Sequence, residues 1–102
     1  MNMKIKYNLT AENLPIIKIN PENVPPNLRD LIPMAEKWGI GDDIIRDDFE
    51  QKAAVADKEE FKNKLKGRTK EVNDWLDSFK NSDMSEEASH FMMMLEALDE
   101  ID

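Results

Sequence analysis

Residues 85–101 have the sequence SEEASHFMMMLEALDEI, in which apolar side chains return every three or four positions. The apolar seam is formed by Ala88, Phe91, Leu95 and Leu98 and is broadened by Met92, Met94 and Ile101. Ser85 is a candidate N-cap in front of this run, because a serine hydroxyl accepts hydrogen bonds from the first free N–H groups of a helix. The stretch therefore predicts an amphipathic helix that buries one face in the core.

The same spacing recurs in the preceding part of the chain, at Phe61, Leu65, Val72, Leu76 and Phe79. Gly67 lies inside this pattern and marks either a bend or a split, at about 1 kcal/mol relative to alanine. Because the step from Leu65 to Val72 is seven residues, or two turns, we predict one helix that starts with Asp57 as its cap. Such a helix would carry a basic stripe at Lys58, Lys62, Lys66 and Lys70.

Residues 25–54 predict shorter helices on either side of two glycines. Apolar residues at helical spacing start at Leu28, but Pro33 interrupts them, so we predict a helix over about 27–31, a break, and a turn over 34–38. Gly39 suits the left-handed position that ends a helix. The next helix starts at Gly41 or Asp42 and ends near residue 54. Its inner face is predicted from Ile44, Ile45, Phe49, Lys52, Ala53 and Ala56.

The first 24 residues are broken repeatedly by asparagine and proline. Residues 4–7 alternate in polarity and residues 15–19 are β-branched, so the segment forms either a small β-hairpin or an extended arm packed over the helices. The predicted fold class is mainly α. It is a compact bundle of four to five short helices, with an N-terminal arm or short strands over 1–24 and a helical domain over 25–102, in a single domain overall.

Residues 31–43, with the sequence LIPMAEKWGIGDD, resemble a segment of a group of small bacterial helical proteins. That group combines the segment with a later W-L-D-S element, here residues 75–78, and with a last helix that starts like residues 85–91. The resemblance covers about residues 25–100 and implies one bacterial helical domain. The group has no assigned function, so the resemblance transfers no catalytic or binding residues.

Charge and cysteine content narrow the class of protein. The chain of 102 residues has a net charge of −8 and no cysteine, which excludes disulfides and cysteine nucleophiles. Without a signal-peptide pattern or an apolar run of about 20 residues, we expect a cytoplasmic protein that does not enter a membrane. The negative charge concentrates in residues 41–60 and 81–102, which would repel nucleic acid and attract a basic protein partner.

Two groups of residues are candidates for partner binding. The first is an acidic cluster of Asp42, Asp43, Asp47, Asp48 and Glu50, whose alternative role is a solvated face that complements the helix dipole. The second is Met92 and Met93 on the last helix, next to Met94. Consecutive helical residues point about 100° apart, so the triplet cannot surround one metal ion, and adaptable packing is the better interpretation.

Catalysis has little support in the sequence. There is no nucleophile–base pair, no phosphate-binding loop and a single histidine, His90. Glu87 and His90 match half of a carboxylate-bridged metal motif, and only a second copy of the chain could supply the other half. We therefore predict no enzyme activity and no catalytic, cofactor-binding or metal-binding residue.

The leading hypothesis is a small acidic protein-binding module, of an inhibitor, immunity-like or regulatory kind, that acts on a basic protein partner. The second hypothesis is a homo-oligomeric structural or regulatory protein, a homodimer in the simplest case, that associates through the methionine-rich last helix. The third is a metal-dependent activity completed across such a dimer at Glu87 and His90.

Overall fold

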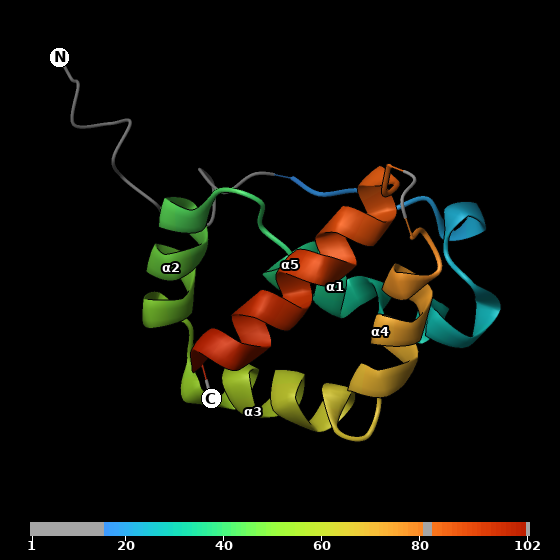
Figure 1. Ribbon diagram of the computed structural model, residues 1–102. Coiled ribbons are helices and arrows are strands. Elements are labelled where there is room, and N and C mark those ends of the chain that lie inside the picture. Colours follow the sequence, from blue (N-terminus) through green and yellow to red (C-terminus); the bar gives the residue numbers. More distant parts are fainter. Residues whose placement is uncertain (1–15, 81–82, 102) are drawn as a thin grey trace, which may run out of the picture.

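The computed structural model describes residues 16–80 and 83–101, which form five α-helices and no strand. The helices are α1 (Ile32–Trp38), α2 (Asp43–Lys52), α3 (Val55–Leu65), α4 (Thr69–Asp77) and α5 (Glu86–Ile101), and two 3₁₀ helices, Pro21–Asn23 and Pro26–Leu31, precede them (Figure 1). The predicted compact helical fold is confirmed. Residues 16–20 are not a strand, and residues 4–7 lie outside the described residues.

Helix α5 is the central element of the bundle. It crosses the molecule diagonally and packs against the four other α-helices (Figure 1). Its inner face is fully buried at Ala88, Phe91, Met94 and Ala97. The Oγ of Ser85 accepts a hydrogen bond from the backbone N–H of Ala88 at 3.1 Å, so the predicted N-cap is confirmed.

The core is built around Trp38 at the end of α1. Its ring stacks on Phe61 of α3 with 4.6 Å between centroids, and the edge of Phe49 of α2 approaches it at 5.1 Å. Ile19 and Val24, which precede the helices, are buried in the same core. The described part of the N-terminal segment therefore packs over the helices, as the extended-arm alternative expects.

The two predicted helical segments around Pro33 are present, as the 3₁₀ helix Pro26–Leu31 and as α1, but the roles predicted for Pro33 and Gly39 are wrong. Pro33 does not break a helix, because it lies in the first turn of α1, where its missing N–H has no partner to lose. Gly39 has a φ of −86°, which is not left-handed. A Cβ on Gly39 would instead lie 2.3 Å from the backbone oxygen of His90. Glycine is needed there because α1 and α5 approach each other so closely.

The single helix predicted from Asp57 to Phe79 is two helices. Gly67 has a φ of +71° and changes the direction of the chain between α3 and α4. The seven-residue step from Leu65 to Val72 is also compatible with two helices, because α3 and α4 both turn their apolar faces to the same core. Arg68 fixes the turn, since its Nη1 lies 2.7 Å from Asp30 and its Nη2 donates to the Asn27 carbonyl at 2.8 Å.

Two features predicted with that long helix change accordingly. Helix α3 starts at Val55 with Ala54 as its N-cap, so Asp57 lies in the first turn and is not the cap. The basic stripe is interrupted, because Lys66 lies in the turn and Lys70 lies on α4. The lysines therefore do not line one helical face.

Replacing Gly67 by alanine is expected to destabilise the protein by about 1 kcal/mol, because a positive φ is unfavourable for a residue with a Cβ. No atom lies within 4 Å of the added Cβ, so the effect is conformational and not steric. Urea denaturation measures the loss. Gly67→Asn should lower the free energy of unfolding by less, since asparagine tolerates a positive φ. An equal loss of stability in both variants would refute this explanation.

None of the helices in the described ranges combines the length and the hydropathy needed to cross a lipid bilayer.

Candidate functional site

The predicted Phe49 and Ala53 do lie on the inner face of α2 and pack against the core, and Ile45 is half-buried. The prediction is wrong at Ile44, and it missed two charged residues on this face. Ile44 is 78% exposed, whereas Arg46 and Glu50 are each only 4% exposed. The carboxylate of Asp42 caps the helix, accepting from the N–H groups of residues 44 and 45 at 2.9 and 3.0 Å. This start places residues 46, 49, 50 and 53 on the face that meets the body.

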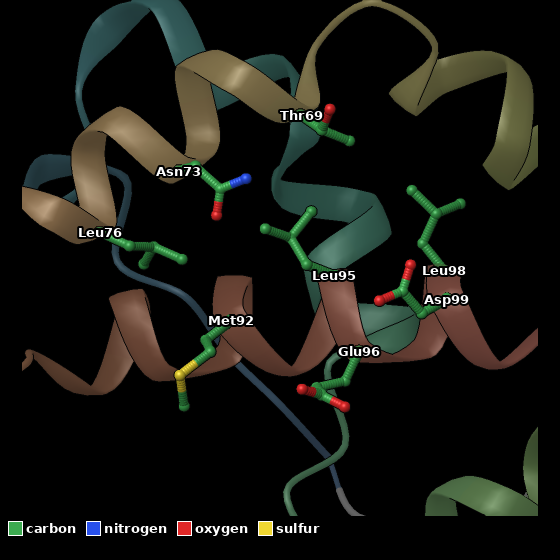
Figure 2. Close-up of a pocket in the computed structure, with 8 residues that line it drawn as sticks. All are labelled: Thr69, Asn73, Leu76, Met92, Leu95, Glu96, Leu98 and Asp99. Atoms are coloured by element: carbon green, nitrogen blue, oxygen red, sulfur yellow. The ribbon is translucent and has the colours of Figure 1, made fainter.

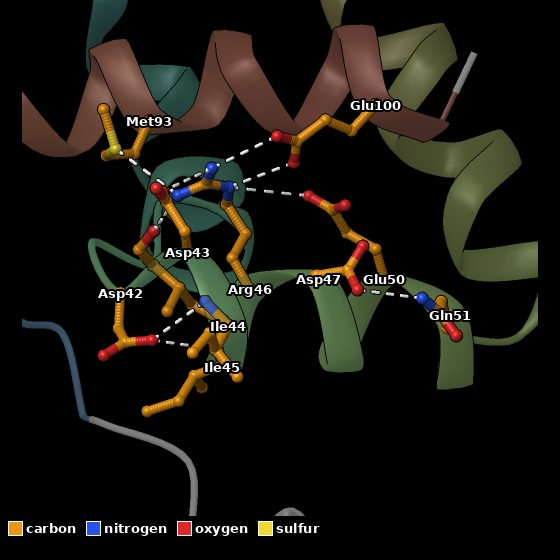
Figure 3. Close-up of polar contacts among 11 residues, drawn as sticks. Asp42, Asp43, Ile44, Ile45, Arg46, Asp47, Glu50, Gln51, Met93 and Glu100 are labelled. Carbon is orange, nitrogen blue, oxygen red and sulfur yellow. Dashed lines mark hydrogen bonds and ion pairs between the residues drawn. The ribbon is translucent and has the colours of Figure 1, made fainter.

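The guanidinium of Arg46 ties α2 to α5 (Figure 3). Its Nε and Nη2 donate to the two carboxylate oxygens of Glu100 at 3.1 and 3.2 Å, and its Nη1 donates to the Ile40 carbonyl at 2.9 Å. Asp43 lies 2.9 Å from Nη2. These hydrogen bonds satisfy the buried guanidinium, which explains how an arginine can occupy a position on this face where an apolar residue would be expected.

Glu50 completes this cluster with unusual electrostatics. Burial raises the pKa of Glu50 to about 8, and the neighbouring Glu100 adds to the rise through a hydrogen bond and its charge. The pKa of Glu100 is lowered, chiefly by its hydrogen bonds with Arg46. Glu50 Oε2 lies 3.7 Å from Arg46 Nε and has no hydrogen-bond partner. The raised pKa of Glu50 and the lowered pKa of Glu100 together favour one proton retained by this pair near neutral pH.

Each of the five predicted acidic residues makes a contact with another group of the same chain. Asp42 caps α2, and Asp43 and Glu50 surround Arg46, as described above. Asp47 accepts a hydrogen bond from Gln51 at 2.9 Å, and Asp48 pairs with Lys52 at 3.0 Å. Each of these carboxylates thus makes a contact within the chain, although Asp42, Asp43 and Asp47 are also exposed to solvent.

The methionine triplet divides among three environments. Met94 is fully buried in the core, and the Sδ of Met93 lies 3.5 Å from Arg46 Nη1. Met92 is 36% exposed and lines a groove on the surface of the molecule. Of the predicted methionines, Met92 alone reaches a candidate binding surface among the described residues.

That groove, of about 380 Å³, lies between α4 and α5 (Figure 2). Thr69, Asn73 and Leu76 line it from α4, and Met92, Leu95, Glu96, Leu98 and Asp99 line it from α5. Leu76 lies toward the Met92 end and Thr69 toward the Leu98 end (Figure 2), so the two helices run antiparallel. The side chains of Leu95 and Leu98 point toward α4 and form its apolar part.

The rim of the groove carries acidic groups without partners. The side-chain carboxylates of Glu96 and Asp99 make no hydrogen bond or ion pair with any residue that the structure describes. Helix α5 has five acidic residues and no lysine or arginine, so nothing on its own surface neutralises them. A second cavity of about 390 Å³ continues past Thr69 and Leu98 toward the end of α3.

His90 has a structural contact and no metal-site neighbours. Its Nδ1–H donates to the carbonyl oxygen of Gly39 at 2.7 Å, because a carbonyl can only accept. Within residues 16–80 and 83–101, no three histidine, cysteine, aspartate or glutamate side chains are placed to hold one metal ion. The Arg46 cluster and the α4–α5 groove are therefore the two sites from which function can be inferred.

The fold and these two sites define a small all-α protein with a buried charge cluster and an acidic, partly apolar surface groove. No protein-family model, curated protein or solved structure matches the chain. The resemblance to the bacterial group remains a prediction. Sequence reasoning singled out Met92 and the acidity of residues 81–102, but it missed Glu96 and Asp99 as individuals, since their shared rim exists only once α4 lies alongside α5.

Proposed function

We propose that the protein is a binding module, not an enzyme, and that it holds a basic segment of a partner protein at the α4–α5 groove. The single observation that carries this proposal is the pair of unpartnered carboxylates, Glu96 and Asp99, beside the apolar side chains of Leu95 and Leu98. A partner that buries an apolar side chain there can pair its own lysine or arginine with the rim.

The groove is a better binding surface than the acidic cluster of α2. The carboxylates of Asp43 and Glu50 are already committed to Arg46, so a partner would have to compete with an internal cation. Glu96 and Asp99 have no such competitor among the described residues. Their charge is available to steer a basic partner and to stabilise it once bound.

A module of this kind acts by binding a segment of its partner and making that segment inaccessible to other molecules. If the basic segment belongs to a site that the partner needs for its own activity, binding inhibits that activity, which is how an inhibitor or immunity-like protein works. If the segment is a docking signal, binding regulates assembly instead. The groove chemistry is the same in both cases.

The experiment is a pull-down of the tagged protein from a lysate of its own host, at low and at moderate salt. The wild type should capture one stoichiometric basic protein that is released as the salt concentration rises. A variant with Glu96→Lys and Asp99→Lys should bind that protein about 10-fold more weakly, because two attractive contacts become repulsive.

The matched control carries Glu22→Lys and Glu60→Lys, which change the net charge equally at exposed positions away from the groove. It should capture the same protein as the wild type. Equal loss in both variants would mean that net charge alone matters, and capture that survives in the groove variant would refute this binding surface. Capture of no protein by the wild type would count against the function itself.

A further inference from the structure

The shape of the groove narrows the kind of segment that it accepts. Its lining residues on α4 span positions 69–76 and those on α5 span positions 92–99, which is about two helical turns on each wall. On α4 the lining residues recur at steps of four and three and form one ridge, and on α5 they form a broader strip that includes the adjacent pairs at 95–96 and 98–99. Two antiparallel walls of equal length fit a third helix between them.

An extended peptide would gain less from this surface. The described residues contain no strand, so there is no sheet edge to which a partner strand could add. The backbone N–H and C=O groups of the groove walls are already bonded within α4 and α5. An extended segment would therefore leave its own backbone groups to water, whereas a helix satisfies them internally.

We propose that the occupant is an amphipathic basic helix of the partner, which lies along α5 as an additional helix of the bundle. This inference rests on the proposed function. The apolar side chains of that helix, at positions i, i+3 or i+4, and i+7, contact Leu76, Leu95 and Leu98. Its basic side chains concentrate at one end, near Glu96 and Asp99, since no acidic residue lines the groove at the Met92 end.

Charge argues against a second copy of the chain as the occupant. A two-fold dimer through this groove would place the α5 helix of one copy against that of the other. Each α5 carries five acidic residues and no lysine or arginine, so the contact would bring like charges together. A basic partner helix removes this repulsion and is the complement that the groove lacks.

The test uses two fluorescently labelled peptides of identical composition, built from leucine, lysine, glutamine and alanine. In the first, leucines at positions i, i+4, i+7 and i+11 form one face and lysines flank it. In the second, the same residues are rearranged so that the leucines surround the helix. Fluorescence anisotropy with the full-length protein at low salt should show at least about 10-fold tighter binding of the first peptide.

A steric variant locates that binding. Asn73 is exposed, lines the groove and makes no side-chain hydrogen bond with another described residue, so Asn73→Trp should fill the groove without disturbing the core. This variant should bind the first peptide about 10-fold more weakly than the wild type. The matched control Asn23→Trp, at an exposed position outside the groove, should bind like the wild type.

The outcomes separate the two proposals. Equal, salt-sensitive binding of both peptides would overturn the helical occupant while leaving a basic partner in place. Failure of both peptides to bind, while the pull-down still yields a partner, would also overturn it. Concentration-dependent dimerisation that Asn73→Trp abolishes would assign the groove to a second copy. If a variant with Lys4→Glu and Lys6→Glu bound the first peptide 10-fold more tightly than the wild type, the groove would be assigned to the N-terminal segment of the same chain.

Discussion

Replacing Gly39 by alanine is expected to destabilise the fold by about 2–3 kcal/mol, the range for inserting an atom into a packed interior. The added Cβ would lie 2.3 Å from the backbone oxygen of His90 and 2.5 Å from that of Ala35. Both are backbone atoms, so no side-chain rotation can relieve the contact. Helices α1 and α5 must move apart, and the hydrogen bond from His90 to the Gly39 carbonyl would be lost.

Urea denaturation monitored by circular dichroism measures this loss. Gly41→Ala is the matched control, because no atom lies within 4 Å of a Cβ placed there. It should change the free energy of unfolding by less than about 0.5 kcal/mol, as surface substitutions usually do. An equally large effect in the control, or no effect at Gly39, would show that the close approach of the two helices does not limit stability.

Replacing Glu50 by glutamine is expected to stabilise the protein at pH 9 by roughly 2–4 kcal/mol and at pH 4.5 by less than about 0.5 kcal/mol. The pKa of Glu50 is raised from its usual 4.5 to about 8 in the folded protein. Below the unfolded pKa the carboxyl is neutral in both states, so it imposes no penalty. As the pH rises toward 8 the unfolded chain ionises first, and the wild type loses stability.

The charged groups around Glu50 explain why ionisation there is unfavourable. Glu100 of α5 and Asp43 of α2 already bind Arg46, so an ionised Glu50 would add a third carboxylate to one guanidinium. Asp47 on the same helix adds to the repulsion. A glutamine amide stays neutral and can donate to Glu100 at every pH.

Urea denaturation at several pH values between 4.5 and 9 tests this expectation. Glu60→Gln, at an exposed position on α3, is the control and should follow the wild-type pH profile. If the wild type and Glu50→Gln keep the same difference at every pH, Glu50 is already ionised in the folded state and the proposed proton on this cluster does not exist.

Much of the secondary structure could be predicted because its causes are local. The last helix follows from its apolar spacing and from Ser85, and the start of α2 follows from Asp42, since capping acts within three residues. The division at Gly67 could not be predicted, because a step of seven residues fits one continuous helix and two helices that face one core. The positive φ that Gly67 adopts in the folded chain, and the contacts of Arg68 with Asp30 and Asn27, distinguish the two.

The candidate sites depend on contacts between distant parts of the chain. Hydrophobicity predicts Ile44 and Ile45 inside α2, but the inner position belongs to Arg46, whose partner Glu100 lies 54 residues away. The groove likewise exists only because α4 runs antiparallel to α5. By itself the sequence determined the helical class, the caps at Asp42 and Ser85, and the acidity of the last helix, because these depend on neighbours within a few turns. The tertiary structure alone decided which charges are buried with a partner and which remain free on the groove, because the energy of a charge depends on the groups that folding brings around it.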